Sequence, residues 1–244
     1  MNGVYILNSE KTNSNLAVID EFSDMNSHFK AEIKKNLYSI LLKRLNPDAY
    51  KSLGIAYRNL NKYDKAIMAL EKAKNLTPFD YQIHSELGIC YLAKGNFCKS
   101  SKELIQAIKL NPDNTDIQIQ LALVHEAMGE TEMAFAIYQK IMETNPECLK
   151  AYVQKAALYL QEENFAEAKN LFRIIIKNFP DYARAFLGMA ICCDKLGNHD
   201  KAKRFYKKYL QLSPDAANSQ NVQERLSTIM FNQNSDKNFL KIVN

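Results

Sequence analysis

The sequence predicts an all-α fold, an α-solenoid of stacked antiparallel helix pairs, and two observations support this prediction. The chain of 244 residues has only 7 glycines, about 3% against a usual ~7%, too few for the turns of a fold with many short strands. The last five of its six prolines recur every 34 residues, which indicates an internal repeat. These prolines are Pro78, Pro112, Pro146, Pro180 and Pro214.

Each repeat has the apolar spacing of two helices joined by a short turn. Tyr50, Leu53 and Tyr57 follow the i, i+3, i+7 pattern of one helix face, and the same spacing resumes after a turn. The proline then ends the second helix, because proline lacks an N–H group and clashes with the preceding turn. Small, aromatic and turn residues recur in register: Gly54, Gly88, Tyr91, Tyr159, Gly95, Gly129 and Gly197.

These motifs resemble the tetratricopeptide repeat. The first unit has Tyr50-x2-Leu53-Gly54-x2-Tyr57 followed by Pro78, and the second has Leu87-Gly88-x2-Tyr91 followed by Pro112. The resemblance implies a right-handed superhelix in which the first helix of each pair lines a concave groove that binds protein partners. Five units are expected, at residues 47–80, 81–114, 115–148, 149–182 and 183–216.

The flanking segments fit the ends of such an array. Residues 22–46 contain one amphipathic packing helix, with Asn46 as the N-cap of the next helix and Pro47 as its first residue. A second helix at 217–231 is expected to cap the last repeat. Residues 1–21 and 232–244 are expected to be flexible tails.

Composition narrows the function classes. The net charge is +5, and the densest basic patch, at 201–208, alternates with apolar residues as the exposed side of an amphipathic helix does. An odd count of five cysteines argues against a secreted disulfide scaffold, and we interpret them as reduced thiols in small apolar sites. No stretch has the length of a membrane span or the pattern of a signal peptide, so we expect a cytoplasmic protein.

No catalytic or metal-binding pattern is recognisable. The motifs of zinc proteases, serine hydrolases and P-loop proteins are absent from the sequence. His84 and His125 stand at repeat positions that hold aromatic residues in other repeats, so packing accounts for both. We therefore predict no enzymatic activity, no cofactor and no metal.

The candidate binding residues lie on the first helix of each pair. Two of its columns are not needed for packing within the pair, and they are aliphatic in the last three units. These residues form either contacts between repeats or an apolar peptide groove. The candidate groove residues are Lys51, Ile55, Arg58, Ile89, Ile119, Leu123, Val153, Ala157, Arg184, Leu187 and Ile191.

The chaperone-tail-binding members of the family clamp a C-terminal carboxylate with Lys, Asn and Arg side chains. This chain has Ile55 and Glu86 at two of the clamp positions, so we predict no carboxylate clamp of the Hsp70/Hsp90 type. The apolar end of the tail at 239–243 is a candidate to occupy the groove itself.

The main hypothesis is a non-enzymatic interaction module that binds a peptide or an amphipathic helix. One alternative is a regulatory subunit stably bound to an enzyme. A weaker alternative is a helical-repeat protein that binds RNA, which the mild basicity favours and the aliphatic groove disfavours.

Overall fold

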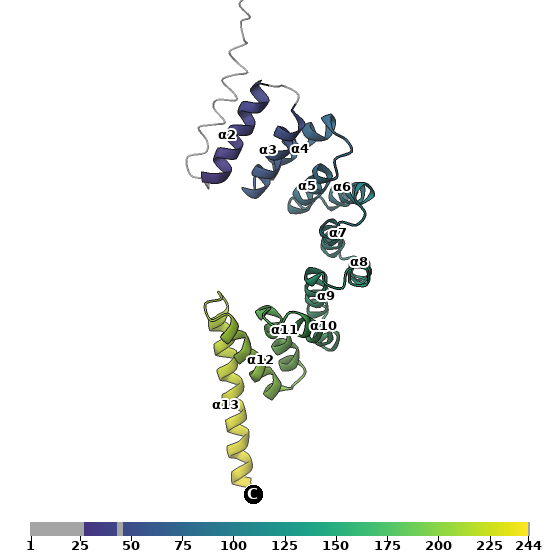
Figure 1. Ribbon diagram of the computed structural model, residues 1–244. Helices are drawn as coiled ribbons and strands as arrows, with labels where there is room; N and C mark the ends of the chain where they lie inside the picture. Colours follow the sequence, from purple (N-terminus) through teal and green to yellow (C-terminus); the bar gives the residue numbers. More distant parts are fainter. Residues whose placement is uncertain (1–26, 43–45, 244) are drawn as a thin grey trace, which may run out of the picture. The chain divides into compact units, whose positions relative to one another are not determined.

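The computed structural model describes residues 27–42 and 46–243, and every regular element within them is a helix (Figure 1). The predicted all-α fold of antiparallel helix pairs is therefore confirmed. The expected tail at residues 1–21 lies outside the described residues. The helices are α2 (Ser27–Leu42), α3 (Pro47–Asn59), α4 (Tyr63–Leu76), α5 (Tyr81–Ala93), α6 (Phe97–Leu110), α7 (Thr115–Ala127), α8 (Thr131–Thr144), α9 (Leu149–Gln161), α10 (Phe165–Asn178), α11 (Ala183–Lys195), α12 (His199–Leu212) and α13 (Ser219–Val243).

The chain divides into two compact units between Glu130 and Thr131. The N-terminal unit holds α2 to α7 and the C-terminal unit holds α8 to α13. Within each unit consecutive helices pack on one another, and each unit has its own apolar core.

The turn between the two helices of a repeat has the same backbone conformation in all five repeats. The residue at this turn has a left-handed φ of 55–76°, and the amide two positions after the end of the first helix bonds back to a carbonyl in its last turn. The turn residues are Asn61, Gly95, Gly129, Glu163 and Gly197. Three of the scarce glycines thus lie where the backbone needs a positive φ.

The paired helices come close where a side chain is missing. A Cβ atom added to Gly54 would lie 2.5 Å from Cγ of Leu70, and one added to Gly88 would lie 2.5 Å from Cγ of Leu104. Each leucine is fully buried. The small-residue column predicted from the sequence therefore marks a helix contact in the first two repeats.

The helix ends follow the sequence signals. Asn46 caps α3 by accepting a hydrogen bond from the Ala49 amide at 3.2 Å, and Pro47 is the first helical residue. The second helices end two residues before the repeating proline, as α4 does at Leu76. The described packing helix α2 covers 27–42 of the expected 22–46.

Two expectations need correction. The C-terminal helix α13 runs to Val243 instead of ending at 231; because no Gly or Pro follows Pro214, nothing in the sequence stops it. Of the five cysteines, Cys98 is exposed, because it faces outward from the first turn of α6. The other four cysteines are also free thiols, and three of them are buried.

Two substitutions at one turn test the left-handed conformation. Glu163 has a φ of 55°, and a left-handed non-glycine residue costs about 1–2 kcal/mol. We expect Glu163→Gly to raise the free energy of unfolding by about 1 kcal/mol, measured by urea denaturation. The neighbouring Glu162 has a φ of −78°, so Glu162→Gly should instead lower it by about 0.5–1 kcal/mol. Equal effects of the two substitutions would contradict the turn assignment.

A candidate peptide-binding pocket in the C-terminal unit

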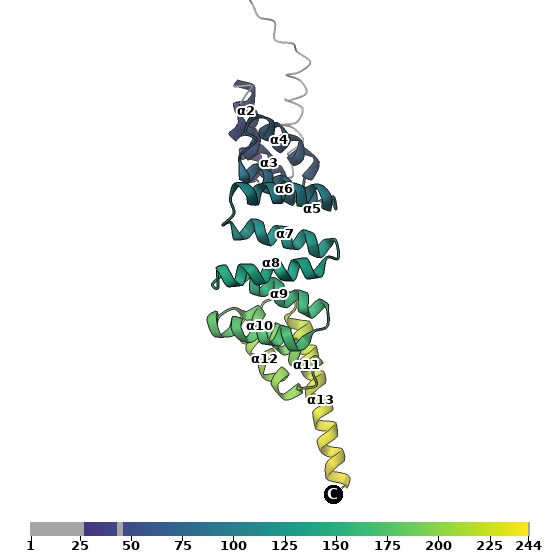
Figure 2. The same cartoon turned by 90° about the vertical axis from the view of Figure 1, so that its right-hand side faces the viewer.

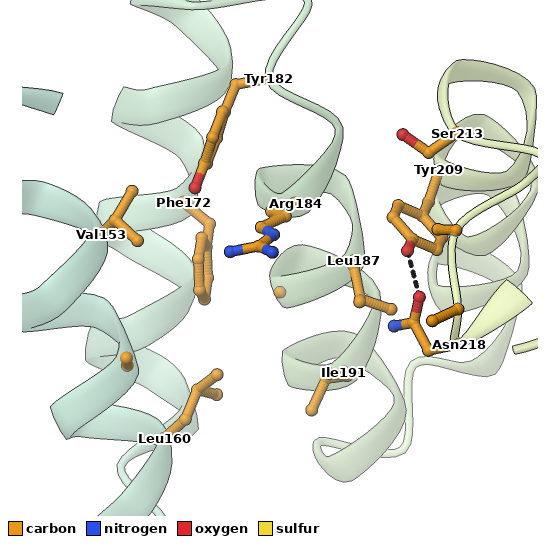
Figure 3. A pocket seen from close by; sticks show the side chains of 14 residues that line it. Val153, Leu160, Phe172, Tyr182, Arg184, Leu187, Ile191, Tyr209, Ser213 and Asn218 are labelled. Carbon is orange, nitrogen blue, oxygen red and sulfur yellow. Dashed lines mark hydrogen bonds between the residues drawn. The ribbon is translucent and has the colours of Figure 1, made fainter. Parts of the chain in front are cut away.

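A pocket of about 690 Å³ opens within the C-terminal unit. It lies between α9, α11 and the segment that connects α12 to α13 (Figure 3). Its volume falls in the range of roughly 300–1,000 Å³ that is usual for ligand sites. The lining residues are Val153, Ala157, Leu160, Phe172, Tyr182, Arg184, Leu187, Gly188, Ile191, Tyr209, Ser213, Ala216, Ala217 and Asn218.

One residue of α11 in the pocket lining, Gly188, has no side chain. A Cβ atom added to Gly188 would overlap the ring of Phe172, which reaches in from α10. The equivalent position one, two and three repeats earlier holds Gln154, Gln120 and Glu86. Gly188 is out of register with the other repeat glycines, and it leaves the ring of Phe172 as part of the pocket wall.

The apolar wall comes from successive first helices. Val153 and Ala157 lie on α9, and Leu187 and Ile191 lie on α11 at the same repeat positions. In Figure 3, the Leu187 side chain points toward the α12–α13 side of the pocket. Leu187, Ile191 and Val153 are only partly buried, so they retain apolar surface for a ligand.

Arg184 is the only charged residue in the lining. Its side chain is exposed, and the structure gives it no ion pair or hydrogen bond with any residue of the described chain. Figure 3 shows its guanidinium directed toward Phe172 and Val153, inside the pocket. An unpaired guanidinium beside apolar side chains favours a ligand with a carboxylate next to an apolar group.

The segment that closes the pocket is held by polar contacts. The Tyr209 hydroxyl donates to Oδ1 of Asn218, and Oγ of Ser219 donates to the Ser213 carbonyl at 3.3 Å. Arg225 of α13 forms two hydrogen bonds to Asp194 of α11, at 2.7 and 2.9 Å. These contacts fix α13 and the preceding segment against the last repeat.

Asp194 is largely buried and is the centre of this attachment. Burial alone would raise the pKa of its carboxyl. The hydrogen bonds and charge of Arg225, together with hydrogen bonds from His199 and Tyr206, outweigh burial and hold that pKa below its usual value.

Five of the eleven predicted groove residues lie in this pocket: Val153, Ala157, Arg184, Leu187 and Ile191. The other six lie in the N-terminal unit. Of these, Ile119 is only 4% exposed and packs in the protein interior, so it offers little surface to a ligand. Ile55, Ile89 and Leu123 are partly buried.

The two predicted cations of the N-terminal unit are paired with acids. Nζ of Lys51 lies 2.8 Å from Asp80, and Arg58 forms an ion pair with Glu86. Glu86 occupies the repeat position that Gly188 has in the C-terminal unit. The same repeat position therefore holds an ion-paired glutamate in the N-terminal unit and a pocket-lining glycine in the C-terminal unit.

Three features of the site were missed from the sequence. Phe172 belongs to α10, the second helix of its repeat, whereas the sequence pattern places the groove on the first helices. Tyr182 and the segment 213–218 lie between helices. Gly188 carried a usable signal, because it is the one glycine within the repeats that departs from the 34-residue register.

The structure also accounts for two polar residues in packed columns. Lys155 replaces the usual leucine and is 8% exposed, with its ammonium 2.6 Å from Oε1 of Gln139. His84 is 6% exposed, and its ring nitrogens lie 2.6 Å from Glu103 and 2.8 Å from the Pro78 carbonyl. Both side chains have structural partners.

Side chains are described for residues 28–40 and 46–231. Within these ranges, no group of three or more His, Cys, Asp or Glu side chains could hold a metal ion. No helix there is both long enough and apolar enough to cross a membrane.

The tail that was expected as a possible occupant is part of α13. The C-terminal half of this helix extends past the other helices of its unit in both views (Figures 1 and 2). The pocket residues instead contact α13 only near its start. Occupation of the groove by residues 239–243 stays a prediction.

Comparison with known proteins gives one family. Two profiles of the tetratricopeptide repeat match the chain, one at residues 47–80 and the other at 125–186 and 159–226, together more than half of its length. A comparison with curated protein sequences gave no significant match.

Solved structures with this fold are similar over most of their length. A tetratricopeptide repeat protein from Parabacteroides merdae has a TM-score of 0.67 and 18% identity, covering 91% of this chain and 88% of that one. YrrB, described as having an unusual peptide-binding site, has a TM-score of 0.56 and 18% identity, with coverage of 78% and 97%. A MamA structure has a TM-score of 0.58 and 20% identity, with coverage of 70% and 93%.

The attachment of α13 should depend on pH through Asp194. Because its pKa is lower in the folded protein, its contribution to stability is complete above the pKa of an unfolded aspartate, about 3.9, and is lost as pH falls through the lower folded value. We expect Asp194→Asn to lower the melting temperature at neutral pH. The difference from wild type should shrink as pH falls below about 4.

Circular dichroism melts across this pH range would measure the difference. The exposed Asp215, which has no described partner, provides the control: Asp215→Asn should match wild type throughout. A constant difference between Asp194→Asn and wild type at all pH values would show that the carboxylate charge is not what holds α13.

Proposed function

The chain belongs to the tetratricopeptide repeat family, and from this we propose that it is a non-enzymatic interaction module that binds a peptide segment of another protein in the pocket of its C-terminal unit. Proteins of this family bind protein partners through their repeats. The observation that carries the proposal is the unpaired Arg184 in an otherwise uncharged, mostly apolar pocket. YrrB, whose fold is similar, has a peptide-binding site of its own.

The lining suggests the chemistry of the peptide. The partly exposed aliphatic side chains at 153, 187 and 191 favour a bulky apolar residue such as Leu or Phe. A carboxylate close to that residue in the peptide would pair with Arg184. Because Arg184 is exposed, water screens this ion pair, and charge-assisted hydrogen bonds to the carboxylate oxygens would give most of its contribution.

The pattern of charges argues for an internal acidic residue and against a clamp on a chain terminus. Lys51 is the only basic residue at a clamp position in the first repeat, and its ammonium is already bound to Asp80 at 2.8 Å. Glu86 adds a negative charge at another clamp position. The proposed ligand therefore differs from the C-terminal tails that bind carboxylate clamps.

Selection from a phage-displayed library of random peptides on the immobilised full chain tests this proposal. We expect enrichment of peptides with Leu or Phe beside Asp or Glu. Selection on Arg184→Glu should enrich Lys or Arg at the acidic position, because the charge of the pocket is reversed. Synthetic peptides from the wild-type selection should lose about tenfold in affinity when the acid is changed to its amide.

Two matched controls locate the binding. Arg204→Glu makes the same charge change on the outside of α12 and should select the wild-type motif. Leu187→Glu should abolish enrichment, whereas Ile174→Glu, at an exposed isoleucine outside the pocket, should not. Identical motifs from wild type and Arg184→Glu would contradict the proposal. A stable enzyme partner recovered by copurification would favour the regulatory-subunit alternative.

A further inference from the structure

A second surface in the C-terminal unit carries a dense positive charge. The helices α10 and α12 both pack on α11 through buried stripes, so their opposite sides face outward. Those outer sides are rich in exposed cations, and we define the basic face by six of them. They are Arg173, Lys177, Lys201, Arg204, Lys207 and Lys208.

The cations of the two helices belong to one region. Lys169 of α10 and Lys201 of α12 both act on the buried thiol of Cys193 in α11. Burial raises the pKa of this thiol, and the two positive charges act in the opposite direction. Both helices pack against α11, so the basic sides of α10 and α12 belong to one packed group of three helices.

The basic face is not neutralised within its own unit. Among the described residues, none of its six side chains forms an ion pair, and their one hydrogen bond joins Arg173 to the neutral Asn170. Glu167 is the acid of α10, and its negative charge acts to raise the pKa values of Lys155 and Tyr159. Asp194 is already bound by Arg225.

Some lysines of the N-terminal unit are paired with acids of the same unit. There Lys51, Lys74 and Lys94 each form an ion pair with an acid from another helix or connection. Clustered like charges without such partners repel one another and disfavour the compact state. The density of unpaired cations on the basic face therefore favours opposite charges supplied by another molecule.

We propose that the basic face of α10 and α12 is a second interaction surface, and that it binds an acidic segment of a partner protein. It is separate from the pocket, because none of its six residues lines that pocket. The proposal therefore stands or falls independently of the proposed peptide binding.

The side chains on these helices favour an acidic polypeptide over other anions. No Phe or Tyr side chain of α10 or α12 is fully exposed, and the exposed His199 ring is bound to Asp194, so the face offers little stacking surface for the bases of single-stranded RNA. Its only large exposed apolar residue is Ile174, at 40%, so it has little to insert into a lipid surface. Four of the six cations are lysines, which pair with single carboxylates as point charges.

Fluorescence anisotropy with labelled poly-glutamate at low salt tests the proposal on the full chain. We expect binding that weakens with salt, and a loss of at least about tenfold in Arg204→Glu/Lys207→Glu/Lys208→Glu. The matched control is Lys34→Glu/Lys102→Glu/Lys109→Glu, which makes the same net-charge change at exposed positions of the N-terminal unit. It should stay within about twofold of wild type. Arg184→Glu should also keep most of the affinity.

Two further probes separate the classes of anion. Oligo-uridylate RNA and phosphatidylserine vesicles should bind more weakly than poly-glutamate. The triple glutamine variant at 204, 207 and 208 should lose affinity as well, and circular dichroism should show native helix content in every variant. Equal losses in the two triple glutamate variants, no binding of poly-glutamate, or tighter binding of RNA or vesicles would each overturn the proposal.

Discussion

The close approach of neighbouring helices at positions without a side chain is the constraint on which this structure depends. At Gly54 and Gly88 the missing Cβ lets a buried leucine of the second helix fill the space between the paired helices. Tight contact buries enough apolar surface to hold helices of 13–14 residues, which are marginal in isolation. At Gly188 the same device admits the Phe172 ring from the preceding pair. There it shapes a pocket as well as a helix contact.

The repeat scaffold is common to both units, but its columns are used differently. In the N-terminal unit, the first helices carry cations that are bound to acids of the next repeat, as Arg58 is to Glu86. In the C-terminal unit, Arg184 has no such partner and lies beside apolar side chains. Identical helix geometry therefore supports a stabilising ion pair in one place and an open binding site in another. Side-chain identity at a few repeat positions makes the difference.

The sequence predicted the features that depend on local interactions. The helix ends before each proline, the Asn46 cap and the repeated turn position all follow from residues close together in the chain. The 34-residue period places Asn61 and Glu163 at the same repeat position as the turn glycines, and both have a positive φ in the structure.

The pocket could be predicted only in part, because it depends on contacts between repeats. The aliphatic column gave Val153, Leu187 and Ile191, but the column alone does not show which of its members are buried, as Ile119 is. The contribution of Phe172 depends on the out-of-register Gly188, and the closing segment depends on how α13 attaches through Asp194 and Arg225. These are long-range contacts that a periodic pattern does not encode.

The central claim is that the C-terminal unit binds a peptide between α9, α11 and the segment 213–218. Methyl NMR of the full chain, titrated with a peptide selected on the wild-type protein, tests it most directly. We predict shifts concentrated at the methyl groups of Val153, Leu187 and Ile191, with those of Ile55 and Ile89 unchanged. Shifts centred on the N-terminal unit, or spread over Ile174 and the outer side of α10, would contradict the account.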